Sequence, residues 1–213
     1  MEIAILLYDG MTALDAIGPY EILSRIPEAE TRFVAVERGL KRTDQRSLGL
    51  HADYRLDEVT DPEIIVIPGG PGQSLQMENG SLMEWIRTVH QVTRWTTSVC
   101  TGSLILAGAG ILNGVRATSH WLAMEVLAEY GAIPVRERVV FDGRIVTGAG
   151  VSAGIDMALQ LAARVGAQQL GEEIQLWIEY DPQPPFVSGS PEKADQEVVA
   201  KLRQRSRFHR KEA

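Results

Sequence analysis

The chain has 213 residues, of which 45% are hydrophobic and 23% are charged. This composition is that of a globular protein with a full core, and it excludes disorder over most of the chain. The net charge of −7 gives no indication that nucleic acid is a partner, and no apolar stretch approaches the roughly 18 residues that span a bilayer. Because there is one cysteine and no visible signal peptide, we expect a cytoplasmic protein without an intrachain disulfide.

Four apolar runs predict strands that are buried on both faces, as in a parallel sheet. They lie at residues 2–8, 32–37, 63–68 and 95–99. Helical patterns separate them. Pro19, at a first-turn position, predicts a helix that begins there, and Ser81 with Glu84 predicts a capping box for the next helix. The small apolar residues of 101–109 suit a helix that packs closely against its neighbours.

The second half of the chain continues this alternation. Helices are predicted at residues 121–130, 152–165 and 168–180, and Asp142-Gly143 predicts a hairpin over residues 138–147. The proline-rich segment 181–191 is expected to be extended. The pattern predicts an α/β fold: a flavodoxin-like, doubly wound, mostly parallel sheet with a β-hairpin insert and a C-terminal extension. One domain would cover residues 1–190, followed by a polar C-terminal helix or tail at 191–213.

The C-terminal residues are rich in positive charge. From Lys201 onward the chain carries Arg203, Arg205, Arg207, Arg210 and Lys211 against one acid, Glu212. We interpret this cluster as a solvated helix end or a frayed tail in preference to a phosphate-binding patch.

Cys100 stands where a buried strand runs directly into a helix, within Thr96–Ser103 (TTSVCTGS). Such a turn lifts a reactive side chain above the carboxyl end of the sheet, as in a nucleophile elbow. The helix N-terminus favours a thiolate, and the N–H of Thr101 is placed to help form an oxyanion hole. A lone cysteine is more often an inert core residue, but this position predicts a catalytic nucleophile.

Two further segments should meet Cys100 at the same edge of the sheet. Pro68-Gly69-Gly70-Pro71-Gly72 follows another buried strand, so Gly69 and Gly70 are predicted to supply a second oxyanion donor and to bind substrate. Asp15 is expected in the turn after the first strand. Taken alone, an Asp before Gly-Pro is best interpreted as a turn former.

The glycine-rich segment 148–154 (GAGVSAG) does not fit a dinucleotide-binding motif. We expect this loop, including Gly150, to contact substrate or the Cys100 region, and we expect no cofactor. The four histidines form no metal-ligand cluster, so no metal site is predicted. His120 is the only plausible histidine base for Cys100, and the sequence alone leaves its role open.

Together these motifs resemble the ThiJ/PfpI superfamily. The resemblance rests on Pro68-Gly69-Gly70, residues 98–102 (SVCTG) and residues 117–121 (ATSHW), and it covers nearly all of residues 1–190. Other segments are most similar to the members that hydrate isocyanides: Leu14-Asp15 with Gly18-Pro19, residues 131–135 and 137–140, 153–156, Glu179-Tyr180, 184–186 and 189–191.

The resemblance implies a homodimer of flavodoxin-like subunits that acts on a small molecule. It implies a cofactor-independent hydro-lyase that converts an isocyanide to an N-substituted formamide through a thioimidate on Cys100. It assigns Asp15 as the acid/base partner of that cysteine, with Thr101 adjoining both.

Other branches of the superfamily fit less well. Intracellular proteases carry a histidine directly after the cysteine, where this chain has Thr101, and sensor-like members usually carry glutamate in place of Asp15. AraC-type regulators add a helix-turn-helix region of roughly 100 residues that is not in this sequence. Two alternatives remain open: a noncatalytic redox or stress sensor in which Cys100 is reversibly oxidised, and a glyoxalase-type enzyme.

Overall fold

A computed structural model of the protein describes residues 1–208. Its centre is a seven-stranded sheet in the order β10-β11-β7-β6-β1-β2-β5. These strands are β1 (Glu2–Leu6), β2 (Glu30–Ala35), β5 (Tyr54–Arg55), β6 (Ile64–Ile67), β7 (Trp95–Val99), β10 (Val139–Asp142) and β11 (Ile145–Gly148). All neighbouring pairs are parallel except β10–β11. Without the two edge strands the order is 2-1-3-4-5, the flavodoxin-like arrangement that the sequence predicts.

The strands that form the middle of the sheet are buried along their length, which explains their continuous apolar sequences. Every residue of β6 and β11 is buried, as are all but the first residues of β1 and β7. The predicted hairpin forms between β10 and β11, and its second strand also pairs with β7. The hairpin therefore completes the main sheet and places the loop after β11 beside the end of β7.

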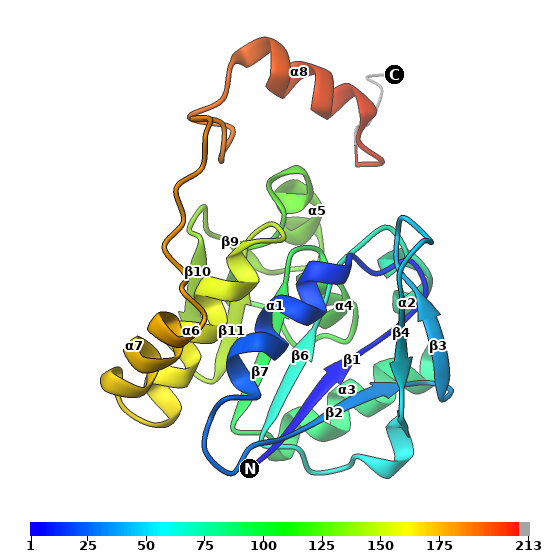
Figure 1. Cartoon of the computed structure of the whole chain (residues 1–213). Helices are drawn as coiled ribbons and strands as arrows, with labels where there is room; N and C mark the ends of the chain where they lie inside the picture. The colour runs from blue at the N-terminus through cyan, green and yellow to red at the C-terminus, as the bar shows by residue number, and fades with distance from the viewer. Residues whose placement is uncertain (209–213) are drawn as a thin grey trace.

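Helices cover both faces of this sheet (Figure 1). On one face lie α1 (Ala13–Leu23), α6 (Ala153–Val165) and α7 (Gln168–Trp177), with α1 and α6 packed against each other. On the other lie α2 (Gln73–Met77), α3 (Gly80–Val92), α4 (Gly102–Gly108) and α5 (Met124–Glu129). Short 3₁₀ helices occur at Leu56–Glu58 and Trp121–Ala123.

Two predicted helix starts are wrong. The first helix begins at Ala13, and Pro19 lies inside it. A proline there removes one helical hydrogen bond, but its ring packs closely on α6, where a Cβ on Gly154 would be 3.3 Å from Pro19 Cδ. The third helix is capped by Asn79, whose side chain accepts the Leu82 N–H, so the Ser81–Glu84 pair does not form the cap.

A second hairpin, which no sequence pattern predicts, is formed by β3 (Gly39–Arg42) and β4 (Gly49–Ala52). These strands are short and mostly partly exposed, so they lack a long apolar pattern. A further small parallel pair consists of β8 (Arg116–Ala117) and β9 (Ile133–Pro134). Both pairs lie outside the main sheet.

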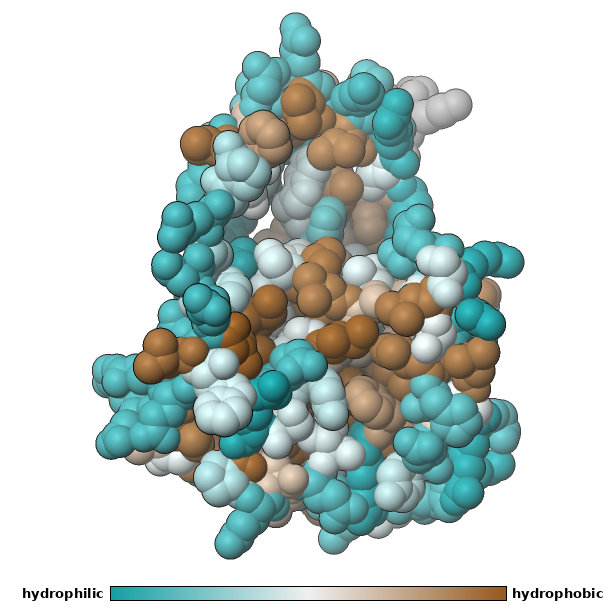
Figure 2. Space-filling view, in the orientation of Figure 1, coloured by the Kyte–Doolittle hydropathy of each residue, from teal (hydrophilic) through white to brown (hydrophobic). Residues whose placement is uncertain are grey.

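The chain ends in a C-terminal arm, residues 179–208, which carries α8 (Gln196–Arg205). Figure 1 shows α8 lying beyond the end of the sheet to which β1 and β6 point, and Figure 2 shows a hollow between α8 and the rest of the molecule. Arg210 and Lys211 of the basic cluster lie outside the described residues. Within residues 1–208, no helix is long and apolar enough to cross a membrane.

Candidate active site

Cys100 occupies a sharp turn between β7 and α4, as the sequence predicts. Its φ is 58°, in the left-handed region that a residue with a side chain seldom adopts. Its N–H donates to the carbonyls of Gly148 and Ala149 at 3.0 and 2.9 Å. The helix that follows approaches β6 so closely that a Cβ on Gly102 would collide with the Ile67 carbonyl oxygen. This packing explains the small residue after the turn and holds the thiol at the carboxyl end of the sheet.

Asp15 lies in the first turn of α1, not in the turn before it. The helix follows β1, which is the neighbour of β6 at the point where the strand order reverses, so Asp15 faces the loops that follow β6 and β7. Its side chain is completely buried. Asp15 Oδ2 accepts the N–H of Gly69 at 2.9 Å. Asp15 Oδ1 is buried and has no hydrogen-bond partner among residues 1–208.

The Asp15 carboxyl group holds its proton more tightly than an ordinary aspartate. Burial is the main cause, and the charge of Asp44 adds to it. The N–H of Gly69 and the neighbouring Cys100 thiol oppose this effect, and the pKa of Asp15 is raised from 3.8 to about 7. The group is therefore poised to gain or lose a proton near neutral pH, as an acid/base catalyst requires.

The Cys100 thiol is also buried, with 5% of the residue exposed. Its sulfur accepts hydrogen bonds from the backbone N–H groups of Val151 and Thr101, which lower its pKa, but burial and the Asp15 charge outweigh them and raise the pKa to about 12. The N–H of Thr101, at the N-terminus of α4, favours the thiolate as expected, but desolvation outweighs it. The N–H of Thr101 points at the sulfur itself.

The thiol and the carboxyl group behave as one unit. Each influences the pKa of the other, and two adjacent buried anions are costly. Because burial raises the pKa of both groups, the pair retains one proton from roughly neutral pH to strongly alkaline pH. A single proton between a sulfur and a carboxylate oxygen provides one nucleophile and one acid in the same site.

The loop formed by residues 68–72 orients this pair. The N–H of Gly69 is directed at Asp15, and the N–H of Gly70 donates to Thr101 Oγ1 at 3.0 Å. Gly70 has a φ of 136°, which accounts for glycine at this position. The predicted use of Gly69 and Gly70 as oxyanion donors does not match this arrangement, because both N–H groups already have acceptors within the protein. Their observed contribution is to hold Asp15 and Thr101 in place.

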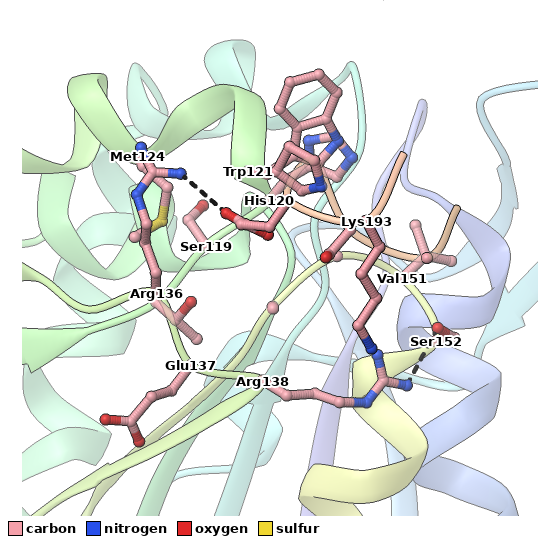
Figure 3. A pocket seen from close by; sticks show the side chains of 17 residues that line it. Ser119, His120, Trp121, Met124, Arg136, Glu137, Arg138, Val151, Ser152 and Lys193 are labelled. Atoms are coloured by element: carbon pink, nitrogen blue, oxygen red, sulfur yellow. Dashed lines mark hydrogen bonds and ion pairs between the residues drawn. The ribbon is translucent and has the colours of Figure 1, made fainter. Parts of the chain in front are cut away.

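A cavity of about 430 Å³ lies beside the turn that carries Cys100. Cys100 itself does not line it, but Val151, whose N–H reaches the cysteine sulfur, does. Figure 3 shows His120 and Trp121 together on one wall, with Arg138 and Ser152 across from them. The residues lining the cavity are Thr118, Ser119, His120, Trp121, Met124, residues 136–138, residues 149–152 and residues 189–193.

The two remaining candidates, Gly150 and His120, both line this cavity. Gly150 lines the cavity and packs against His120, where a Cβ would lie 2.9 Å from Cδ2 of the imidazole ring. The His120 Nδ1 accepts the N–H of Leu122 at 3.3 Å, and burial together with the nearby charge of Arg207 lowers its pKa. Within residues 1–208 no hydrogen bond joins His120 to Cys100, and His120 forms part of the cavity wall.

Sequence reasoning missed several residues that support the site. Ser119 Oγ donates to the Cys100 carbonyl at 3.0 Å, and Tyr8 Oη donates to the Pro68 carbonyl at 2.8 Å. Val151, with a φ of 31°, presents its N–H to the sulfur. Ser119 lies within a quoted motif, whereas Tyr8 and Val151 carry no sequence signal because they act through position and backbone.

The described residues include no group of three or more His, Cys, Asp or Glu side chains that could hold a metal ion. The site consists of a thiol, a carboxyl group, a hydroxyl group and backbone N–H groups. These groups suit nucleophilic attack with transfer of one proton.

Comparisons with known proteins found relatives that cover most of the chain. A model of the DJ-1/PfpI family matches residues 1–164. The isonitrile hydratase of Pseudomonas putida is 39% identical over 206 residues, which cover 97% of this chain and 90% of that protein. The HTH-type transcriptional regulator CdhR of Pseudomonas aeruginosa is 30% identical over 78% of this chain, but the match spans only 50% of its length. The crystal structure of a ThiJ/PfpI family protein from Pseudomonas syringae has a TM-score of 0.92 and 36% identity, covering 94% of this chain and 84% of that one.

Proposed function

The chain belongs to the DJ-1/PfpI family, and we propose that it hydrates isocyanides, R–N≡C, to N-substituted formamides. Its similarity to an isonitrile hydratase along almost the whole of both chains supports this reaction within a family whose members differ in activity. The substrate would be a small molecule, and the residues that we assign to the chemistry are Cys100, Asp15 and Thr101.

The observation that carries the proposal is the buried pair of Cys100 and Asp15. An isocyanide offers one electrophilic carbon that must gain a nucleophile and a proton. A pair that holds one mobile proton between sulfur and oxygen can supply both. The unpaired Asp15 Oδ1 offers an oxygen through which the proton can move.

In the first step the Cys100 sulfur attacks the terminal carbon of the isocyanide while Asp15 accepts the thiol proton. Asp15 then gives the proton to the same carbon, and the product is a thioimidate, R–N=CH–S–Cys100. A C–S bond and a C–H bond have formed and an S–H bond has broken. Covalent attachment divides one difficult hydration into two easier steps.

In the second step water adds to the thioimidate carbon, with one of its protons passing to nitrogen. The resulting tetrahedral adduct expels the Cys100 sulfur and forms the formamide, R–NH–CHO. The proton of the adduct hydroxyl returns to the sulfur by way of Asp15. The N–H groups of Val151 and Thr101 stabilise negative charge on the sulfur each time it attacks or leaves.

Thr101 contributes by position. Its hydroxyl oxygen accepts the Gly70 N–H, and its own N–H points at the sulfur. It therefore ties the glycine loop, which carries the donor to Asp15, to the turn that carries Cys100.

We further propose that two copies of the chain form a homodimer in the cytoplasm. The proline-rich segment 181–191 is almost entirely exposed, and the large apolar side chains there and at the end of α7 remain in contact with solvent. These are Leu176, Trp177, Phe186 and Val187, each more than three-quarters exposed. Apolar surface of this kind favours association. The lone cysteine is compatible with a reducing compartment.

The test is a turnover assay with a small panel of isocyanides, α-dicarbonyls and amides, run on the wild type and on Cys100→Ala. We expect formamide production from at least one isocyanide, no turnover by Cys100→Ala, and a substrate adduct on Cys100 in intact-mass spectra under single-turnover conditions. Consumption of methylglyoxal without isocyanide hydration would replace the proposal with glyoxalase-type chemistry. Peroxide-sensitive oxidation of Cys100 with no turnover of any substrate would replace it with a sensor role.

A further inference from the structure

Arg207 belongs to the segment that the sequence predicts as a solvated or frayed tail, but it reaches back to the loop formed by residues 68–72. Its guanidinium donates to the carbonyl oxygens of Pro71 and Gly70, the latter at 2.9 Å, and to Gln73 Oε1 at 2.9 Å. Arg207 and Pro71 are 136 residues apart in the chain. Although the residue as a whole is exposed, two of these hydrogen bonds lie in partly buried surroundings.

The contacts of Arg207 complete the hydrogen bonding of the loop that orients the reactive pair. The Pro68 carbonyl accepts the Tyr8 hydroxyl, and the Gly69 carbonyl accepts the Thr12 N–H. The next carbonyl, that of Gly70, accepts the Gln73 N–H at 3.1 Å as well as Arg207.

The two carbonyls that Arg207 holds belong to consecutive residues. A guanidinium can engage both because its donors form a planar fork.

The orientation of these carbonyls bears directly on the chemistry. The N–H groups of the same loop point at Asp15 and Thr101. Each peptide unit is rigid and planar, so the Gly69 and Gly70 N–H groups turn together with the Pro68 and Gly69 carbonyls. The two carbonyls that Arg207 holds belong to the next two peptide units, and fixing them limits rotation about the Gly70 Cα, which joins them to the unit that carries the Gly70 N–H.

The positive charge of Arg207 also lies near the site that contains Cys100. It interacts electrostatically with Tyr8 and Cys100, and it contributes to the lowered pKa of His120. Its three hydrogen-bond acceptors are all uncharged oxygens. Phe208, the next residue, packs against the core and lines a cavity with Met77 and Leu104. The end of the arm is therefore attached to the body of the protein by the three hydrogen bonds of Arg207 and by the apolar contacts of Phe208.

We propose that Arg207 is a positioning residue for the Cys100–Asp15 pair, which it controls by holding the carbonyls of Gly70 and Pro71. The C-terminal arm is then part of the active site. This inference rests on the proposed role of Cys100 and Asp15 as the reactive pair, but it does not require that the substrate be an isocyanide.

The experiment measures the pH dependence of Cys100 alkylation by iodoacetamide in the full-length wild type, Arg207→Gln, Arg207→Lys and Arg205→Gln. Mass spectrometry follows the reaction at the only cysteine. The pair loses its first proton near the Asp15 pKa of about 7, and above that pH a fraction of the pair is thiolate. The midpoint of this first rise in alkylation rate is compared between variants, and it does not depend on how easily the reagent reaches the sulfur. The titratable and charged groups around the pair are Tyr8, Asp44, His120 and Arg207, and only Arg207 changes in the test variants.

Without the Arg207 guanidinium, the Gly69 N–H should be held less firmly against Asp15. That hydrogen bond lowers the Asp15 pKa, so we expect the alkylation midpoint of Arg207→Gln to move to higher pH by about half a unit to one unit. Arg207→Lys keeps the charge but cannot engage both carbonyls in the same way, so its midpoint should move similarly. Arg205, in the last turn of α8, is exposed, and its substitution should leave the midpoint at the wild-type value.

Three results would overturn the proposal. An unchanged midpoint in Arg207→Gln would remove any role for this residue in the site. A wild-type midpoint in Arg207→Lys would mean that charge alone suffices. An equal shift in Arg205→Gln would indicate a general effect of the charge of the arm. Because alkylation needs no isocyanide, failure of the hydration assay and failure of this inference are separate outcomes.

Discussion

Replacement of Asp15 by asparagine removes proton transfer by this side chain but keeps its size and shape. Asparagine is nearly isosteric, and its carbonyl oxygen can still accept the Gly69 N–H that Asp15 receives at 2.9 Å. It cannot take the proton of Cys100 and return it. Since general acid–base catalysis is typically worth about 10²–10⁴ in rate, we expect kcat/KM for isocyanide hydration to fall at least about a hundredfold. Steady-state kinetics over a range of pH measure this loss.

The same substitution should stabilise the protein at alkaline pH. The folded-state pKa of Asp15 is raised from 3.8 to about 7, which corresponds to an unfavourable contribution of about 4 kcal/mol once the group is ionised in both states. A raised carboxyl pKa means that the folded state binds the proton more tightly than the unfolded chain. Stability is therefore greatest below the unfolded-state pKa and is lost as the pH rises through about 7.

The asparagine side chain carries no charge, so the variant should lack this pH dependence. By pH 5 the wild type has already lost about 1–2 kcal/mol of this stability, because the unfolded-state pKa of 3.8 lies below that pH. Between about pH 5 and about pH 8.5, the stability of Asp15→Asn relative to wild type should therefore rise by about 2–3 kcal/mol. Denaturant unfolding of both proteins at the two pH values provides the measurement, and the data are fitted with one common value of m, the dependence of the unfolding free energy on denaturant concentration.

Asp44→Asn is the matched control. Asp44 raises the pKa of Asp15 through its charge, but it is hydrogen-bonded to the Thr12 hydroxyl and the Gln45 N–H. Its substitution should leave the hydration rate within a few-fold of wild type. Wild-type turnover by Asp15→Asn, together with an unchanged dependence of stability on pH, would return Asp15 to the role of a helix-terminal residue and refute the assigned mechanism.

Three other outcomes test the framework of the site and its assembly. Thr101→Val leaves the buried N–H of Gly70 without its acceptor, so we expect the free energy of unfolding in chemical denaturation to drop by about 1–3 kcal/mol. No change would mean that water or another group replaces the hydroxyl. Gly102→Ala should destabilise the fold by more than about 2 kcal/mol, because a Cβ there collides with a carbonyl oxygen of β6. Gly80→Ala is the control, and it should be neutral or slightly stabilising because the space around Gly80 is open. Equal Tm values for the two variants would contradict the packing argument. Analytical ultracentrifugation at micromolar concentration should find a species of twice the 23.4 kDa chain mass, and a monomer alone would exclude the proposed homodimer.

The amino-acid sequence by itself determined the main sheet, apart from its edge strand β5, and the position of Cys100. Strands buried on both faces leave continuous apolar runs, and for that reason the run at residues 95–99 predicts β7 with its observed bounds. The hairpin followed from the Asp142-Gly143 turn. The place of Cys100 at the end of β7 followed from the same local pattern, because a strand that runs directly into a helix needs a sharp turn. These features depend on neighbours in the chain, so a linear sequence contains them.

Only the tertiary structure decided how the groups of the site are arranged. The alternation of strands and helices indicates that several loops share one edge of the sheet, but it does not indicate which N–H meets which acceptor. Gly69 and Gly70 therefore face Asp15 and Thr101 and not an oxyanion. The contact between Arg207 and Pro71 spans 136 residues and left no periodic or local signal. The pKa values of Cys100 and Asp15 depend above all on burial, which arises when the whole chain packs and water is excluded from both groups.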